Sequence, residues 1–269
     1  MEKQLKRRGF LRISALLAAS AWAGRSSFAA PVSAGVPDPL LVEDLVAANR
    51  ILAAEGVVDG YGHVSVRHPR NPERFLISRS IAPELVTASD IVELDLDGDP
   101  VDATGRKLYL ERFIHGEIYK RRPDVKSIVH HHAASIISFG ITKVPLRPVY
   151  HMAAFVGEGV PVFEIREAGG DTDMLVRNAG LGHALAITLG DKPAALMRGH
   201  GAVVVGSSIS EAVARSVYLQ TNAKLQAQAI ALGGEVTYLN AAEVANLKSP
   251  NWYDRAWELW KRKALAGMR

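Results

Sequence analysis

The alternation of strand-like and helical segments constrains the fold of this chain more than any other feature. Short apolar stretches bounded by turn residues predict strands, and apolar residues at helical spacing predict helices between them. The predicted strands are 63–67, 74–78, 91–95, 125–132, 160–163, 194–198 and 201–206, and the predicted helices are 40–55, 109–122, 172–190, 208–232 and 252–261. This order, in 269 residues that are 48% hydrophobic, predicts one α/β domain with a sizeable core.

Local signals mark several helix ends. Gly56 follows the first helical pattern and is expected to stop it, and Ser208 with Glu211 has the spacing of a capping box. The last helical pattern carries three tryptophans, which need apolar partners. It is therefore predicted to be a C-terminal extension that packs on the domain.

The first 30 residues have the composition of an export signal. A basic start is followed by an apolar stretch and by small residues at 27–30. Arg7 and Arg8, followed by Gly-Phe-Leu, resemble the twin-arginine signal that directs folded bacterial proteins to the periplasm. A basic helix on a membrane surface is the alternative, and it explains less of this motif. We expect a signal peptide at 1–30, a linker at 31–40, a single domain with its helical extension at 41–269, and a periplasmic location reached by the twin-arginine route.

The basic excess of the chain lies in this signal. Residues 1–29 hold six of the 32 Lys and Arg residues and one of the 28 Asp and Glu residues, so 26 basic and 27 acidic side chains remain after cleavage. Nothing in this near-neutral remainder argues for nucleic-acid binding, and no apolar run reaches the roughly 20 residues of a membrane span. We therefore expect a small-molecule substrate, no nucleic acid and no stable membrane insertion after cleavage. Because the chain has no cysteine, histidine and carboxylate must bind any transition metal.

Three consecutive histidines end one predicted strand. Side chains alternate along a strand, so His130 and His132 point to one face and His131 to the other, where it is expected to be packed or hydrogen-bonded. An H-x-H pair alone is equally typical of two hydrogen-bonded histidines at a strand end. His200 adds a third imidazole, flanked by glycines that let the backbone approach closely. Three neutral imidazoles with an open position are typical of a catalytic divalent-metal site.

Glu111 is the carboxylate candidate for the same site. It lies in the helical pattern just before the histidine strand, and His115 follows four residues later on the same predicted helix face. Taken alone, Glu111 would be an ordinary solvated helix carboxylate. It becomes a candidate for the site only because the histidines occur in the same chain.

Together these residues resemble the class II aldolase/adducin family, which includes metal-dependent fuculose- and ribulose-phosphate aldolases and epimerases. The resemblance runs from about Leu41 to Gly234. It rests on G-H-V-S-V-R at 62–67, E-x-x-x-H at 111–115, R-P-D-V-K-S-I-V-H-H-H at 122–132 and R-G-H-G-A-V-V-V-G at 198–206. It implies a three-layer α/β/α fold with a central, largely antiparallel sheet, and a homotetramer with active sites at subunit interfaces.

The resemblance also implies roles for the candidate residues. His130, His132 and His200 would bind one divalent metal ion per chain, zinc or else manganese, cobalt or iron. Glu111 would be the acid/base that can also approach the metal.

Two departures from the sugar-phosphate aldolases bear on the substrate. Those enzymes usually have P-S-S-E, with serines that bind phosphate, where this chain has L-Y-L-E at 108–111. They usually have G-N-x-S where this chain has Gly62, His63, Val64 and Ser65. Tyr109 and Leu110 cannot form the same hydroxyl cradle. The sequence resembles instead a branch of decarboxylases that act on carboxylated ring-cleavage products or dihydroxyphthalates.

One scaffold can serve both reactions, because retro-aldol cleavage and decarboxylation each leave electrons that a cation stabilises as an enolate. Glu111 would then deliver or remove the proton. The expected function is a metal-dependent carbon–carbon lyase, a decarboxylase of an unphosphorylated carboxylated hydroxy-carbonyl or catechol-like compound. An aldolase or epimerase acting on a small sugar-like substrate is the alternative within enzymes, and a non-catalytic adducin-like binding protein is the alternative outside them.

Several polar residues are candidates for holding the substrate. A substrate carboxylate needs cationic or hydrogen-bonding partners beside the metal. The candidates are His63, Arg67, Arg79, Tyr150 and His151. Each is equally compatible with an ordinary polar residue near the end of a strand.

Overall fold

A seven-stranded sheet forms the centre of the protein. The structure, a computed structural model, describes residues 33–101, 105–247 and 252–266. The strands are β1 (His63–Arg67), β2 (Arg74–Ser78), β3 (Ile91–Asp95), β4 (Ser127–His131), β5 (Val162–Phe163), β6 (Ala194–Met197) and β7 (Gly201–Gly206). Their order is β3-β2-β1-β4-β7-β6-β5, and all neighbours are antiparallel except β5 and β6.

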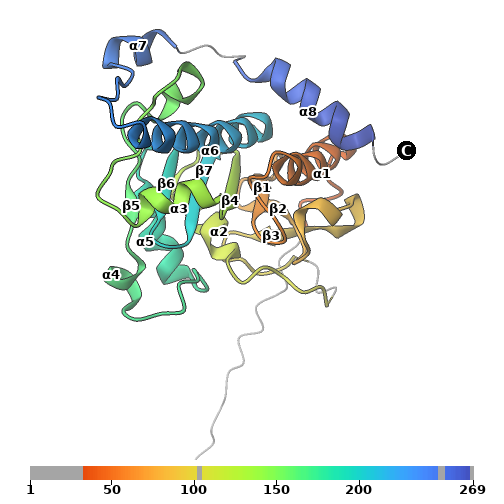
Figure 1. Ribbon diagram of the computed structural model, residues 1–269. Helices are drawn as coiled ribbons and strands as arrows, with labels where there is room; N and C mark the ends of the chain where they lie inside the picture. Colours follow the sequence, from red (N-terminus) through yellow and green to blue (C-terminus); the bar gives the residue numbers. More distant parts are fainter. Residues whose placement is uncertain (1–32, 102–104, 248–251, 267–269) are drawn as a thin grey trace, which may run out of the picture. The chain divides into compact units, whose positions relative to one another are not determined.

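Helices cover both faces of this sheet. The longer ones are α1 (Pro39–Ala54), α2 (Arg112–Arg121), α3 (Ala134–Gly140), α5 (Ala179–Leu189), α6 (Ile209–Ala231) and α8 (Asp254–Ala266). The shorter ones are η1 (Pro83–Leu85), η2 (Ala88–Asp90), η3 (His151–Val156), α4 (Ile165–Gly169) and α7 (Ala241–Asn246). Helices α2 and α5 pack on one face, and α1, α3 and α6 pack on the other (Figure 1). The expected three-layer α/β/α fold with a largely antiparallel sheet is confirmed.

The two central strands divide the core by alternation. Ile128 of β4 and Val203 of β7 are fully buried in the cluster formed with α2 and α5. Their neighbours Val129 and Val204 are equally buried, but they face the helices on the opposite side. A strand buried on both faces has little choice of register, since a shift by one residue would exchange the two sets. This fixes the place where β4 presents its histidines.

The C-terminal helix finds the apolar partners that its tryptophans require. Helix α8 lies against α1 and α6, and Trp257 and Trp260 pack on the cluster that α1 shares with the sheet. Trp260 also lies 5.8 Å from Tyr218 of α6, measured between ring centroids. The extension is thus part of the packed structure.

Two predicted helices begin later than their patterns indicate. The pattern at 172–190 becomes a helix only from Ala179, because Asn178 caps it by accepting a hydrogen bond from Leu181 N–H and Met174 has a left-handed backbone, with φ 72°. The pattern at 109–122 becomes helical at Arg112.

The predicted capping box at the start of α6 forms only in part. Ser208 accepts from the N–H of Glu211 as expected. The Glu211 carboxylate, however, accepts from the N–H and hydroxyl of Ser207 rather than from Ser208.

The predicted signal peptide lies outside the described residues. Within the predicted linker, Asp38 caps α1 by accepting from Leu40 N–H, and the helix begins at Pro39. Among the residues that the structure describes, no helix combines the length and the apolar character needed to cross a membrane.

Candidate metal centre

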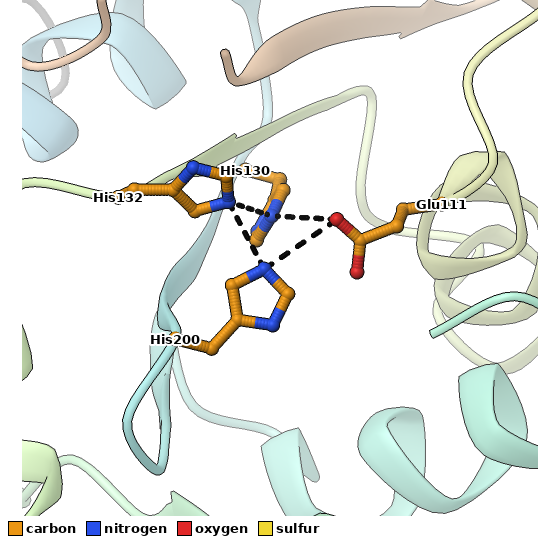
Figure 2. A group of neighbouring side chains, drawn as sticks. All are labelled: Glu111, His130, His132 and His200. Carbon is orange, nitrogen blue, oxygen red and sulfur yellow. Dashed lines mark hydrogen bonds and ion pairs between the residues drawn. The ribbon is translucent and has the colours of Figure 1, made fainter. Parts of the chain in front are cut away.

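Strand β4 delivers two of the candidate ligands. His130 lies within the strand and is fully buried, and His132 is the first residue after the end of the strand. Their Nε2 atoms lie 2.9 Å apart, on the same side of the sheet (Figure 2). His131 points away, is also fully buried, and accepts a hydrogen bond at Nδ1 from Ala133 N–H. The predicted division of the three histidines is confirmed.

Glycines bring the third histidine to the first two. His200 lies in the turn between β6 and β7, and Gly199 takes a left-handed conformation there, with φ 63°. A Cβ atom on Gly201 would lie 2.0 Å from the backbone oxygen of His131. Only glycine allows this approach, and it places Nε2 of His200 3.0 Å from Nε2 of His132.

Glu111 occupies the N-cap position of α2 rather than a place within the helix. Glu111 is only 7% exposed. One of its carboxylate oxygens is held in place, since Oε1 accepts a hydrogen bond from Val176 N–H at 2.9 Å. Oε2 lies 3.4 Å from Nε2 of both His130 and His200. Figure 2 shows this oxygen facing the three imidazoles.

The orientation of the rings decides what this group can bind. Nδ1 of His130 donates to the carbonyl of Ala202 at 3.1 Å, and Nδ1 of His200 donates to the carbonyl of Met174 at 2.8 Å. In the neutral rings both Nε2 atoms therefore present lone pairs toward His132. Lone pairs at such distances repel unless a proton or a cation lies among them. Backbone carbonyls that fix the outer ring nitrogen are also the usual partners of metal-binding histidines.

The complete donor set fits a divalent metal ion. One ligand atom from each of Glu111, His130, His132 and His200 lies within 4.8 Å of every other. Three imidazole nitrogens and one carboxylate oxygen suit zinc and other first-row divalent ions. These are the residues that the resemblance to the class II aldolase/adducin family implied for the site.

The pKa shifts of the cluster reflect the contacts between Glu111 and the histidines. Burial alone would raise the pKa of Glu111, but hydrogen bonds and ion pairs with His130 and His200 outweigh it and hold that pKa well below its usual value. Burial and the charge of His130 lower the pKa of His132 to about 4. Burial alone would lower the pKa of His200, whereas Glu111 reverses this and raises it. An ionised carboxylate among histidines thus attracts positive charge to this point.

Comparison with known proteins decides the family. The profile described as Class II Aldolase and Adducin N-terminal domain matches residues 43–227, more than half of the chain. The chain belongs to the class II aldolase/adducin family.

Relatives within this family include decarboxylases and aldolases. The chain is 35% identical over 257 residues to Decarboxylase tropJ of Talaromyces stipitatus, covering 86% of this chain and 97% of the relative. It is 32% identical over 214 residues to a 3,4-dihydroxyphthalate decarboxylase of Terrabacter, covering 74% and 85%. Among solved structures, L-fuculose 1-phosphate aldolase from Glaciozyma antarctica superposes with a TM-score of 0.71 at 26% identity, covering 84% and 89% of the two chains. These similarities support an enzyme of the lyase class.

His63 is the substrate-binding candidate that lies beside the metal centre. It is 4% exposed, and its ring centroid lies 5.1 Å from that of His130 and 4.5 Å from that of Tyr109. Tyr109 donates to the carbonyl of Ile81 at 2.6 Å, so its hydroxyl points away from the cluster toward the backbone. No phosphate-binding hydroxyl therefore comes from this position, as the sequence predicted.

The two arginine candidates have partners of their own. Arg67 donates to the carbonyls of Val125 and Tyr119 at 3.0 and 2.6 Å, and to those of Pro72 and Arg122. These hydrogen bonds connect the end of β1 to the C-terminal part of α2, and they satisfy the guanidinium group of the buried Arg67. Arg79 pairs through Nε with Asp90 at 2.6 Å, and its side chain remains 38% exposed.

Tyr150 and His151 lie at another part of the fold. Tyr150 precedes η3 and donates to the carbonyl of Tyr218, and His151 is exposed beside Trp252. A groove that reaches His151 is also lined by Val205 and Gly206, at the end of β7 away from His200. Within the described chain, the structure does not bring these two residues to the metal centre.

Sequence reasoning missed the loop that orients the cluster. The carbonyl of Met174 fixes His200, and the N–H of Val176 fixes Glu111. Both are backbone groups, so no side-chain type marks them in the sequence. The left-handed conformation of Met174 turns the loop there, and a methionine carries no signal for it.

Proposed function

We propose that this protein is a divalent-metal-dependent carboxy-lyase that acts on an unphosphorylated, carboxylated hydroxy-carbonyl or catechol-like compound. The observation that carries the proposal is the meeting of three imidazole nitrogens and a buried carboxylate oxygen within 4.8 Å. The choice of decarboxylation is supported by the two decarboxylases to which the chain is 35% and 32% identical.

In this proposal the metal would stabilise negative charge and Glu111 would transfer the proton. A divalent ion held by His130, His132 and His200 supplies Lewis acidity that lowers the energy of an enolate. Glu111 begins the reaction as a carboxylate, and Oε2, which faces the histidines, is its acceptor atom, since Val176 N–H holds Oε1. It can take a proton from a substrate hydroxyl and return it to carbon once carbon dioxide has left. The electron pair of the broken carbon–carbon bond then forms the new carbon–hydrogen bond.

The surroundings of the cluster favour a substrate without phosphate. The position that carries serines in sugar-phosphate aldolases is filled by Tyr109 and Leu110, and the Tyr109 hydroxyl is bonded to Ile81. The rings of Tyr109 and His63 pack against each other beside the metal centre, with centroids 4.5 Å apart. A flat, partly aromatic carboxylate is suited to stacking on such rings.

The test is a substrate panel with two readouts. Zinc-, manganese- and iron-loaded mature protein is incubated with dihydroxyphthalates, other carboxylated catechols and β-keto acids, and carbon dioxide and aldehyde release are followed together. We expect carbon dioxide without aldehyde, abolished by a chelator and restored by added metal. Aldehyde release from hydroxy-carbonyl compounds would instead identify an aldolase, for which the likeness to L-fuculose 1-phosphate aldolase is the supporting observation.

If the metal-loaded protein releases neither carbon dioxide nor aldehyde from any compound of the panel, that result would favour the adducin-like alternative. That alternative has less support, since a scaffold protein has no need of four converging metal-binding side chains.

Location and assembly complete the proposal. The R-R-G-F-L motif supports export to the periplasm by the twin-arginine route. Family membership supports a homotetramer, in which Tyr150 and His151 of one chain are available to the metal centre of another. Light scattering of the mature protein gives the mass of the assembly and so tests whether it is a tetramer.

A further inference from the structure

A buried chain of polar side chains runs from the metal centre into the core between β1 and α2. His63 and Ser65 lie two residues apart on β1 and point to the face that α2 covers. His115 and Tyr119 lie four residues apart on α2 and meet them. All four are between 0% and 4% exposed, so water does not compete for their hydrogen bonds.

Each link of this chain is short. Nδ1 of His63 lies 2.6 Å from Nε2 of His115, and Nδ1 of His115 lies 2.6 Å from the hydroxyl of Ser65. The Ser65 hydroxyl lies 2.8 Å from that of Tyr119. Every link needs one proton and one lone pair, and a neutral imidazole has one of each, so the direction of one hydrogen bond of His115 determines the direction of the other.

Two directions satisfy all the links and also give the hydroxyl proton of Ser65 an acceptor. If Ser65 accepted from both His115 and Tyr119, its own buried proton would have no acceptor among its contacts in the described chain. In the first, Tyr119 donates to Ser65, Ser65 donates to His115, and Nε2–H of His115 donates to Nδ1 of His63. In the second, every bond is reversed, and Tyr119 must donate to the carbonyl of Lys126, which lies 3.5 Å away. A 3.5 Å contact is at the limit of a hydrogen bond, whereas the first direction uses only the short links.

The direction determines which nitrogen of His63 carries the proton. When Nδ1 of His63 accepts from His115, the proton of the neutral imidazole must be on Nε2. Nε2 lies across the ring from Nδ1. It has no hydrogen-bond partner among the described residues, and it does not belong to their fully buried polar atoms that lack a partner, so it is not completely enclosed. The ring itself lies against His130 of the metal centre.

We propose that His63 presents a fixed Nε2–H donor to an oxygen of the bound substrate, and that His115 and Ser65 are positioning residues that hold His63 in this tautomer. The ligand is a substrate carboxylate or hydroxyl oxygen beside the metal, so this inference rests on the proposed function for the identity of the acceptor. The tautomer itself does not depend on it. His63 is thus a substrate-contacting residue, and its partners act only through it.

The tautomer is measured directly by nuclear magnetic resonance. Long-range proton–nitrogen correlation spectra of zinc-loaded protein with nitrogen-15 histidine distinguish Nε2–H from Nδ1–H, and the spectrum of a His63→Asn variant assigns the His63 signals. We expect Nε2–H in the wild type. Ser65→Ala breaks the link to His115, so the preference should weaken and both tautomers should appear. Ser127→Ala is the matched control, because it removes a buried serine hydroxyl that bonds only to the backbone oxygen of Ser65.

Tyr119→Phe separates the two directions. In the proposed direction Ser65 still donates to His115 without Tyr119, so the tautomer of His63 should not change. In the reverse direction Ser65 would lose its acceptor, and the tautomer should shift. Nδ1–H in the wild type, or a shift in Tyr119→Phe, would overturn the inference, as would an unchanged preference in Ser65→Ala.

Kinetics test the contact with substrate. His63→Phe removes the donor and should reduce kcat/KM by about tenfold or more, while His63→Asn, which keeps an N–H donor, should retain more activity. Metal content should be unchanged in both variants, because His63 is not one of the four side chains that converge at the metal centre. Equal loss in the two variants would contradict the substrate contact. If no substrate is found, the proposed function fails, but the tautomer measurement still decides the inference.

Discussion

Four side chains meet at the metal centre, and the loss of each should have a different effect. The three histidines offer ring nitrogens whose orientation is fixed by the backbone on the far side, at least for His130 and His200. Glu111 has one oxygen held by Val176 and the other turned to the histidines. The first three are suited to binding the metal, and the fourth is suited also to moving a proton.

Replacing Glu111 by Gln should separate these roles. The amide keeps the shape and can still accept from Val176 N–H, but it cannot take up a proton. We expect turnover to fall by about 10²-fold or more, with metal content largely intact. Elemental analysis and single-turnover rates measure the two effects. Wild-type turnover, where chemistry limits the rate, would show that another group moves the proton.

His200→Ala should lose both metal and activity. It removes a ligand and also leaves the ionised Glu111 without one of its two histidine partners. His183→Ala is the matched control, because His183 is an exposed histidine on α5 whose side chain is 58% accessible. Equal metal content in the two purified variants would exclude His200 as a ligand.

The ligands could be predicted from the sequence because their side-chain types carry the chemistry, and period-two alternation places His130 and His132 on one face. The role of Ser65 could not be, since a buried serine on a strand looks like any small core residue. Its function appears only when His115 of α2 lies against it.

At the scale of elements, the close approach of β4 and β7 sets the geometry of the site. His131 pairs with Ala202 in register, and Gly201 packs against the backbone at His131. Strand positions were predictable from short apolar stretches bounded by turn residues, and six of the seven strands lie close to their predicted ranges. The loop at 170–178 could not be predicted, because its apolar residues have helical spacing. Its conformation is determined instead by the cap at Asn178 and the left-handed backbone of Met174.

Gly201→Ala should destabilise the fold and loosen the metal site. The new Cβ would lie 2.0 Å from the oxygen of His131, so one of the two strands must move. We expect a loss of about 2 kcal/mol or more in unfolding free energy, seen as a fall of several degrees in apparent Tm, together with weaker metal binding. Gly60→Ala is the control, since a Cβ there meets nothing within 4 Å. Equal Tm values for the two variants would contradict this account of β4 and β7.

At the scale of the whole molecule, a metal ion at this site would join parts of the chain that are far apart in sequence. It would connect the start of α2, the end of β4 and the turn before β7. An ion that binds only the folded state stabilises it in proportion to the logarithm of its concentration over Kd, about 4 kcal/mol at a thousandfold excess.

Removal of the metal should therefore lower Tm. We expect dialysis against a chelator to lower Tm by several degrees and addition of zinc to restore it, as followed by calorimetry. The His130→Ala, His132→Ala double variant should show neither change. If the chelator removes the bound metal and the wild-type Tm stays the same, the ion does not hold these elements together.

The same dependence gives a reason for the export route that the sequence predicts. A domain that acquires its metal while it folds in the cytoplasm must cross the membrane folded, and the twin-arginine route accepts folded proteins.

Replacing Arg7 and Arg8 together by Lys tests this route. The change keeps the charge of the segment but removes the arginine pair, so the precursor should remain in the cytoplasm, uncleaved yet folded and containing metal. Replacing Lys3 and Lys6 together by Arg is the matched control and should leave export unchanged. Cell fractionation with immunoblotting locates the protein, and elemental analysis of the retained precursor shows whether the metal was acquired before export. Normal accumulation of the twin-lysine variant in the periplasm would refute the route, and a retained precursor without metal would refute loading in the cytoplasm.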